Sequence, residues 1–255
     1  MKIYVCVKHV PDSAATITIR EKNQIDESVT FLLNPYDEHA VEEAARLRAQ
    51  MQDSEVVAVT LGKEGALGTL QSALAMGADR GILIKTDDRP DSILTARALK
   101  AAIEQDGKPD IIFTGKESID SEGMQTMFRL AAALGVPVAT NVVTFSVDRN
   151  NARVECELEA GVKQLLEMPL PCVIAAGKGL NKPKYPTFMD IRKSKKKEIK
   201  QIELDSLPIE KTVARMEILE LRPAVEQRQP KELNGPPEES VQQLIQVLRE
   251  EAKVI

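Results

Sequence analysis

The sequence has no tryptophan, two histidines and three cysteines, and aromatic residues make up 3% of its 255 residues. So few aromatic rings argue against binding of single-stranded nucleic acid by stacking, and a net charge of −5 argues against nucleic-acid binding in general. Cys6, Cys156 and Cys172 show no CxxC spacing, so the sequence predicts no metal site and no histidine-based triad. Sparse cysteines are typical of reduced thiols in a reducing compartment.

A long apolar run is also lacking. No segment approaches the length of about 20 apolar residues that a helix needs to span a bilayer, and the N-terminal apolar run is far shorter than that of a signal peptide. We therefore expect a cytoplasmic protein that does not span a membrane. The hydrophobic content of 43% and the charged content of 29% are typical of a globular protein with a sizeable core.

The first 140 residues alternate short apolar runs with segments of helical periodicity. Repeated strand–helix units of this kind predict a parallel, right-handed, doubly wound sheet. The predicted strands are residues 3–7, 55–61, 80–84 and 111–113. The predicted helices are residues 34–47, with Asn34 as cap and Pro35 at the first position, then 67–76, 91–103 and a helix ending near Gly135.

The pattern changes after Asn141. Residues 142–147 and 154–158 alternate as antiparallel strands do, and residues 171–176 predict a buried strand, which extends the α/β domain to about residue 180. Residues 181–200 lack a core pattern and carry a run of lysines, which is typical of a protruding arm or, more simply, of a solvated surface. Residues 201–255 predict an extended tail with a terminal amphipathic helix, which would wrap this chain's core or a partner.

The stretch from Asp110 to Asn141 predicts a buried strand, a loop of small and polar residues and a helix. In an open parallel sheet, ligands bind outside the carboxyl ends of the strands, and a helix N-terminus there offers N–H groups to a phosphate. This loop is therefore a candidate nucleotide site. On the local sequence alone, an ordinary connection with a polar helix cap is the better interpretation.

Six segments point further, because they occur in the order and at the spacing of one family. They are VCVKHVPD (5–12), NPYDEHAVEEAARL (34–47), ALAMGADRGI (73–82), GKESIDSEGMQT (115–126), LNKPKYPTFMDI (180–191) and the lysine run. Over essentially its full length the chain closely resembles the β subunit of electron transfer flavoproteins. The resemblance implies a Rossmann-like fold of the adenine-nucleotide α-hydrolase type with an arm and a tail. It also implies an electron carrier without catalytic residues of its own.

The resemblance further implies partners and a nucleotide. The obligate partner is an α subunit that carries a redox-active FAD. Most β subunits in the family hold AMP, and flavin-bifurcating ones hold a second FAD in the same place. The positions that match the family's nucleotide contacts are Cys6, Asn34, Pro35, Tyr36, Asp37 and Leu61, with the loop Gly115, Lys116, Glu117, Ser118, Ile119, Asp120, Ser121, Glu122, Gly123, Met124, Gln125 and Thr126.

Within the loop, backbone N–H groups from Ser121 to Thr126 would cradle a phosphate. Asp120 is expected to orient the loop or meet the ribose, because like charges repel. The loop departs from the family pattern, which reads close to QAIDGD or QAIDDD where this chain reads ESIDSE, and Met127 replaces a glycine. The resemblance thus predicts the site but leaves the geometry of the loop open.

Asp91, Ser92 and Thr95 resemble the ADTLATS motif of bifurcating members. Hydroxyl groups at a helix N-terminus can donate to a second phosphate or to a flavin, although Asp91 or Ser92 also suits a simple helix cap. We expect FAD in this subunit, with AMP as the alternative. FAD would imply hydride acceptance from NAD(P)H and division of the electron pair between two paths.

In the family, the arm anchors a client dehydrogenase, usually through a leucine. Phe188 stands at that position, with Tyr185, Met189 and Ile191 around it. An exposed aromatic residue fits a binding hot spot, and the alternative is that Phe188 folds back onto its own domain. Lys163 stands where the family has an acidic residue, so the identity of the client is open.

Other functions predict different patterns. A stress-protein-like nucleotide-binding protein would show Gly-x-x-Gly followed by Gly-Ser or Gly-Thr, and this pattern is absent after Gly115. An ATP pyrophosphatase would need an SGGxDS-type loop after the first strand, where residues 8–12 read KHVPD. A protein that serves only to bind partners is the remaining alternative, and it would carry no nucleotide.

Overall fold

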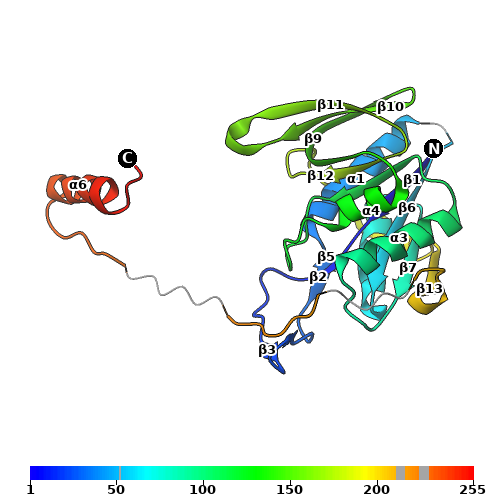
Figure 1. Ribbon diagram of the computed structural model, residues 1–255, viewed down its shortest axis with the longest axis horizontal. Helices are drawn as coiled ribbons and strands as arrows, with labels where there is room; N and C mark the ends of the chain where they lie inside the picture. The colour runs from blue at the N-terminus through cyan, green and yellow to red at the C-terminus, as the bar shows by residue number, and fades with distance from the viewer. Residues whose placement is uncertain (52, 211–215, 224–229) are drawn as a thin grey trace. The chain divides into compact units, whose positions relative to one another are not determined.

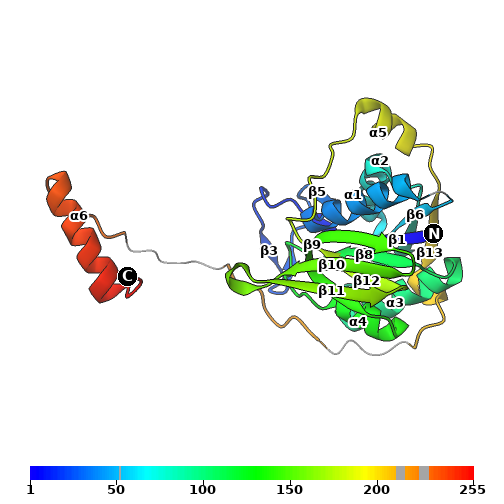
Figure 2. The same cartoon turned by 90° about the horizontal axis from the view of Figure 1, so that it is seen from above.

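The computed structural model describes residues 1–51, 53–210, 216–223 and 230–255. The chain divides into two compact units, Met1–Leu219 and Glu220–Ile255. The first unit is a three-layer α/β domain with a sheet between two pairs of helices (Figures 1 and 2). The described residues contain no helix long and apolar enough to cross a membrane.

The central sheet has nine strands among the described residues, in the order β11-β10-β9-β12-β8-β1-β6-β7-β13. Neighbouring strands run parallel except for β10, which is antiparallel to both β9 and β11. The prediction of a doubly wound, mostly parallel sheet is confirmed. The strands are β1 (Lys2–Cys6), β6 (Glu55–Gly62), β7 (Arg80–Lys85), β8 (Ile111–Gly115), β9 (Val138–Asp148), β10 (Asn151–Glu157), β11 (Lys163–Pro169), β12 (Cys172–Ala176) and β13 (Ile199–Glu203).

Helices α1 (Pro35–Gln50) and α2 (Leu67–Met76) cover one face of the sheet, and α3 (Ser92–Asp106) and α4 (Thr126–Leu134) cover the other (Figure 2). Strand β1 is buried between them, because its side chains alternate between the two apolar layers. Ile3 and Val5 pack with α1 and α2, whereas Tyr4 and Cys6 pack with α3 and α4. Two-sided burial explains why this strand reads as one continuous apolar run.

The local signals for the helix ends are confirmed. Pro35 opens α1 after the cap residue Asn34, and Asp91 caps α3 by accepting hydrogen bonds from the N–H groups of Ile93 and Leu94. Helix α2 stops at Gly77, whose φ of 136° disfavours other residues, and α4 stops at Gly135 in the left-handed conformation.

The antiparallel section contains one strand more than predicted. Strands β9 and β10 match the predicted alternation, but β11 was missed because its side chains do not alternate, and Leu165 on it is 75% exposed. The excursion between β1 and α1 forms two small pairs, β2 (His9–Pro11) with β5 (Phe31–Leu33) and β3 (Ile19–Arg20) with β4 (Gln24–Ile25). Short 3₁₀ turns lie at Glu64–Ala66, Glu159–Gly161 and Leu204–Ser206.

The predicted arm is more ordered than its sequence suggests. It contains α5 (Phe188–Ser194), which begins with a capping box at Thr187 and Asp190 and packs against α2. The Oγ of Ser194 accepts a hydrogen bond from Gln71, and the ammonium of Lys197 donates to the carbonyls of Leu74 and Ala78 at the end of α2. The C-terminal end of α5 is therefore tied to the domain.

Strand β13 was not predicted, and it lies across the predicted boundary at residue 200. It joins the sheet by pairing in parallel with β7 from Ile199 to Glu203. Ile202 is the one well-buried side chain of this strand, so its sequence shows little of the apolar pattern that predicts a strand. The start of the predicted tail thus belongs to the sheet, while residues 211–215 and 224–229 of that tail lie outside the described residues. The division into domain, arm and tail stays a prediction.

The second unit contains the predicted terminal helix. It comprises α6 (Pro237–Gln246), which continues into a π-helical turn at Val247–Glu251. Val241, Leu244 and Ile245 lie on one stripe and are exposed. An amphipathic helix with an exposed apolar stripe is typical of a segment that docks on another surface.

Candidate nucleotide site

The candidate site lies where the strand order reverses. From β1 the chain passes to β6 and β7 on one side, and then returns to place β8 on the other side of β1. The crevice outside the carboxyl ends of β1 and β8 is therefore the topological switch point, the usual ligand position in open α/β sheets. The loop of residues 116–125 follows β8 at this edge and leads into α4.

The buried carboxylate of Asp37 joins three elements at the crevice. It stands in the first turn of α1 and is 5% exposed. One oxygen accepts a hydrogen bond from the N–H of Lys8 after β1 at 2.7 Å, and the other accepts one from the N–H of Gly115 at the end of β8 at 2.9 Å. Burial raises the pKa of Asp37 to about 7, although the two backbone hydrogen bonds lower it.

The close approach of α1 to β8 requires glycine at position 115. A Cβ atom there would lie 2.7 Å from the Cβ of Tyr36 and would collide with the carboxylate of Asp37. The start of the predicted phosphate loop is thus fixed by contact with the start of α1.

Asn34 holds the loop from the other side. Although it is the cap residue of α1, its side chain makes no cap hydrogen bond. Its amide donates to the carbonyl of Glu117 at 2.9 Å and accepts from the N–H of Ile119 at 3.2 Å. Asn34 and Asp37, both predicted as nucleotide contacts, therefore organise the loop in this structure.

Lys8 was not predicted, yet its side chain enters the loop. Its ammonium contacts Asp120 at 2.6 Å, Ser118 at 3.1 Å and Ser121 at 3.3 Å, and the two serine hydroxyls are 2.8 Å apart. Asp120 was expected either to orient the loop or to meet the ribose, and these contacts fit the first role. The position of Lys8, directly after the first strand at the crevice edge, was the available sequence signal.

The second half of the loop is open to solvent, but two of its N–H groups are used, because those of Ser121 and Glu122 donate to the carbonyl of Ser118. Residues 121–125 are exposed, and Glu122 and Met124 adopt positive φ angles of 46° and 45°. The cap position of α4 is Gln125, which makes no side-chain cap hydrogen bond, and its Oε1 accepts from Arg129 instead. The first N–H groups of α4 thus lack a side-chain acceptor and can meet an anion.

The remaining predicted contacts surround the crevice at different depths. Cys6 is buried at the end of β1, and Leu61 is half-buried near the end of β6. Burial raises the pKa of the Cys6 thiol to about 12, which makes it an inert apolar surface rather than a nucleophile. The hydroxyl of Thr114, next to Gly115, is buried and has no hydrogen-bond partner in the described part of the chain.

Two lysine ammonium groups lie close to the ring of Tyr36. The ammonium of Lys116 lies 5.2 Å from the ring centroid, and that of Lys178, which follows β12, lies 5.7 Å from it. Lys116 also pairs with Glu117 at 3.2 Å. Lys178 was not predicted, because it is distant in sequence from the motif segments at the crevice.

Asp91, Ser92 and Thr95 start α3. The cap made by Asp91 is the simpler role considered for it, and Ser92 and Thr95 are half-buried in the first turn. The contribution of these three residues to a cofactor site stays a prediction. Among the described residues, no group of three or more His, Cys, Asp or Glu side chains could hold a metal ion.

The arm presents its predicted contact residues to solvent. Tyr185 is 94% and Phe188 is 79% exposed, and Met189 and Ile191 are exposed beside them. The alternative in which Phe188 folds back onto its own domain is therefore wrong. Met189 also lines a shallow pocket of about 180 Å³ with Arg192, Lys193 and Lys196, so the apolar and basic parts of the arm adjoin.

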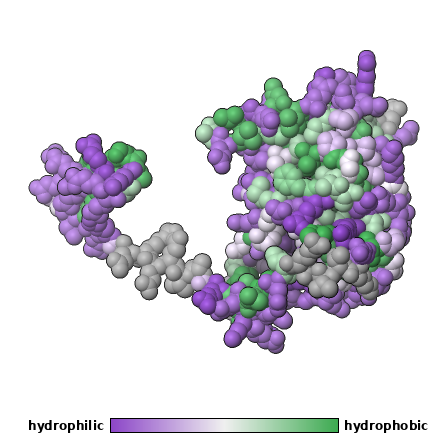
Figure 3. Space-filling model, in the orientation of Figure 1, coloured by the Kyte–Doolittle hydropathy of each residue, from purple (hydrophilic) through white to green (hydrophobic). Residues whose placement is uncertain are grey.

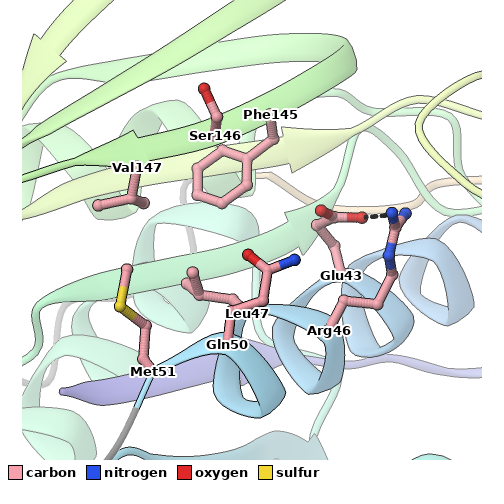
Figure 4. Close-up of a pocket in the computed structure, with 8 residues that line it drawn as sticks. All are labelled: Glu43, Arg46, Leu47, Gln50, Met51, Phe145, Ser146 and Val147. Carbon is pink, nitrogen blue, oxygen red and sulfur yellow. Dashed lines mark hydrogen bonds and ion pairs between the residues drawn. The ribbon is translucent and has the colours of Figure 1, made fainter.

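Two other surface features lie outside the crevice. Apolar side chains gather at the turn between β10 and β11, namely Leu158, Val162 and Leu165 (Figure 3). A pocket of about 220 Å³ separates the C-terminal half of α1 from β9 (Figure 4), and it is lined by Glu43, Arg46, Leu47, Gln50, Met51, Phe145, Ser146 and Val147. Neither contains a predicted nucleotide contact.

Comparison with known proteins identifies the fold and its relatives. Residues 22–207 match the electron transfer flavoprotein domain. The chain is 33% identical to the electron transfer flavoprotein subunit beta of Bacillus subtilis and 36% identical to the mitochondrial one of Arabidopsis thaliana, in both cases over the full length of both chains. It is 34% identical to the human subunit beta over 83% of this chain and 85% of the human one.

The contact between Gly115 and α1 predicts a cost for any added atom. Gly115→Ala should lower the free energy of unfolding by about 1–3 kcal/mol, because the new Cβ overpacks the junction with Tyr36 and Asp37. Chemical denaturation followed by circular dichroism measures this change. Gly123→Ala is the matched control in the same loop, since a Cβ there meets nothing within 4 Å. Equal stability of the two variants would contradict the proposed packing.

Proposed function

Since the chain belongs to the electron transfer flavoprotein family as a β subunit, we propose that it binds an adenine nucleotide in the crevice beyond β1 and β8. With an α subunit it would pass electrons between a dehydrogenase or NAD(P)H and an acceptor. The observation that carries the proposal is the loop after β8, which Asp37, Asn34 and Lys8 hold in front of an uncapped helix. Such a scaffold suits a phosphate.

The phosphate would lie against the second half of the loop. Residues 121–125 are exposed there and lead into α4. The N–H groups of residues 123–126 have no acceptor recorded in the described chain, whereas those of Ser121 and Glu122 donate to the carbonyl of Ser118. Arg129 occupies the oxygen of the Gln125 amide, which leaves the Nε2 group of that amide to donate. The hydroxyl of Thr126 adds another donor. The carboxylate of Asp120 would not need to move for a phosphate to bind, because it is already turned toward Lys8.

The base and ribose would lie nearer the strand ends. Cys6 and Leu61 provide an apolar surface at the ends of β1 and β6. The orphaned hydroxyl of Thr114 supplies a nearby polar group. Apolar walls with a few polar groups are the usual composition of a nucleotide pocket.

FAD is the nucleotide that we propose for this subunit, with AMP as the alternative. The support comes from Ser92 and Thr95, whose hydroxyls stand in the first turn of α3 with the cap Asp91 beside them. A bound FAD would supply a redox-active flavin that AMP lacks. In that case this subunit would accept electrons from NAD(P)H, and the protein would be of the bifurcating type.

Two surfaces are proposed for partners. The exposed apolar stripe of α6 would be covered by the α subunit, because an amphipathic helix of this kind needs an apolar partner surface. The arm around Phe188, including Tyr185, Met189 and Ile191, would bind the client dehydrogenase. A cytoplasmic location stays a prediction.

The nucleotide content of the heterodimer tests the proposal. Denaturing release and chromatography of the co-expressed complex should yield two FAD and no AMP per heterodimer, since the α subunit contributes one flavin. One FAD with one AMP would identify the alternative and would contradict the role given to Ser92 and Thr95. A complex with no nucleotide beyond one flavin would contradict the site itself.

The arm predicts a change in client binding alone. Phe188→Ala should weaken binding of the dehydrogenase that exchanges electrons fastest with the wild-type heterodimer in a purified panel. The expected loss is about 2 kcal/mol, or about thirtyfold in Kd, as for an aromatic hot spot. Surface plasmon resonance gives Kd, and nucleotide content should not change. Ile17→Ala, which truncates an exposed apolar side chain elsewhere, is the control. Equal effects of both variants would contradict the assignment.

A further inference from the structure

We propose that Lys8 is a positioning residue that neutralises Asp120, so that the phosphate of a nucleotide can approach the loop. The inference rests on the proposed function and adds a residue that lies outside the predicted contacts. Its basis is a cluster of four side chains that joins the end of β1 to the middle of the loop: Lys8, Ser118, Asp120 and Ser121.

The ammonium of Lys8 is fully used within this cluster. Three N–H donors face three oxygens, the carboxylate of Asp120 at 2.6 Å and the hydroxyls of Ser118 and Ser121 at 3.1 and 3.3 Å. The main chain of Lys8 is fixed as well, since its N–H donates to Asp37 and its carbonyl accepts from the N–H of Asn34. Lys8 is therefore held at both ends, and its charge has a fixed place.

That place adjoins the proposed phosphate position. Ser121, which Lys8 contacts, directly follows Asp120, and the N–H groups without an acceptor recorded in the described chain begin two residues later, at Gly123. The side chain of Asp120 is 14% exposed, so water screens its charge poorly. Burial favours the neutral form, but the charge and hydrogen bond of Lys8, together with hydrogen bonds from Ser118 and the main chain, hold the pKa of Asp120 below its usual range.

No other contact recorded in the described chain offers Asp120 a second cation. The loop itself contains one lysine, Lys116, and this lysine pairs with Glu117. Without Lys8, a carboxylate would stand unpaired beside the proposed phosphate, and Glu122 would add a second negative charge. Repulsion between like charges would then oppose the phosphate specifically, and it would leave an uncharged nucleoside unaffected.

A purely structural tie makes a different prediction. If Lys8 only holds the loop in place, its loss should weaken AMP and adenosine alike, and removing the charge of Asp120 should not help. If Lys8 acts by neutralising Asp120, its loss should affect AMP alone, and removal of both charges should restore binding. The two readings therefore separate in a double-mutant cycle.

The experiment measures Kd for AMP and for adenosine by isothermal titration calorimetry on the nucleotide-depleted heterodimer. Lys8→Met should weaken AMP binding by about tenfold or more, with adenosine changed by less than about threefold. The double variant K8M/D120N should regain AMP binding to within about threefold of wild type. Lys108→Met, which removes an exposed charge from the loop between α3 and β8, is the control and should leave both values unchanged.

Several results would overturn the inference. Equal losses for AMP and adenosine in Lys8→Met, or a double variant as weak as the single one, would show that Lys8 acts only as a tie. If Lys8→Met does not fold, Asp120→Asn decides: an unpaired Lys8 should strengthen AMP binding by about threefold or more and leave adenosine unchanged, and unchanged AMP binding would overturn the inference. Wild-type protein that binds neither ligand would instead contradict the proposed function.

Discussion

The buried carboxylate of Asp37 is the interaction on which the rest of the site depends. It accepts hydrogen bonds from Lys8, two residues after β1, and from Gly115, the last residue of β8, so two neighbouring strand ends are fixed to the start of α1 by one side chain. Gly115 permits the close approach, and Asn34 extends the same contact to the loop. A buried carboxylate without hydrogen-bond donors is costly. Packings of α1 that would separate Asp37 from the N–H groups of Lys8 and Gly115 are therefore disfavoured.

Much of the fold follows from local sequence patterns. Helix starts and stops at Pro35, Gly77, Asp91 and Gly135 are visible because each residue type has a backbone reason to stand there. Strand β13 could not be predicted, because its pairing with β7 depends on residues more than a hundred positions away and only Ile202 carries an apolar signal. Helix α5 could not be predicted either, because its sequence has no apolar periodicity. The helix is stabilised instead by its capping box and by contacts with α2.

The sequence predicted a candidate loop but not the contacts within it, and a nucleotide at that loop stays a prediction. The family motif directed attention to the loop after β8, and the strand order puts that loop at the topological switch point. Residue type alone does not distinguish a side chain that contacts a ligand from one that holds the protein's own main chain. Asn34, Asp37 and Asp91 were all predicted as nucleotide contacts, yet in the structure each forms hydrogen bonds with main-chain groups of the protein. Lys8 was missed because its partners follow more than a hundred residues later.

A crystal structure of the heterodimer with AMP bound tests the central claim most directly. The account predicts that the phosphate lies within hydrogen-bond distance of the N–H groups of residues 123–126, while Asp37 keeps its bonds to Lys8 and Gly115 and Asp120 keeps its bond to Lys8. A nucleotide whose phosphate instead lies on Lys116 and Lys178 beside Tyr36, or one bound outside this crevice, would contradict it.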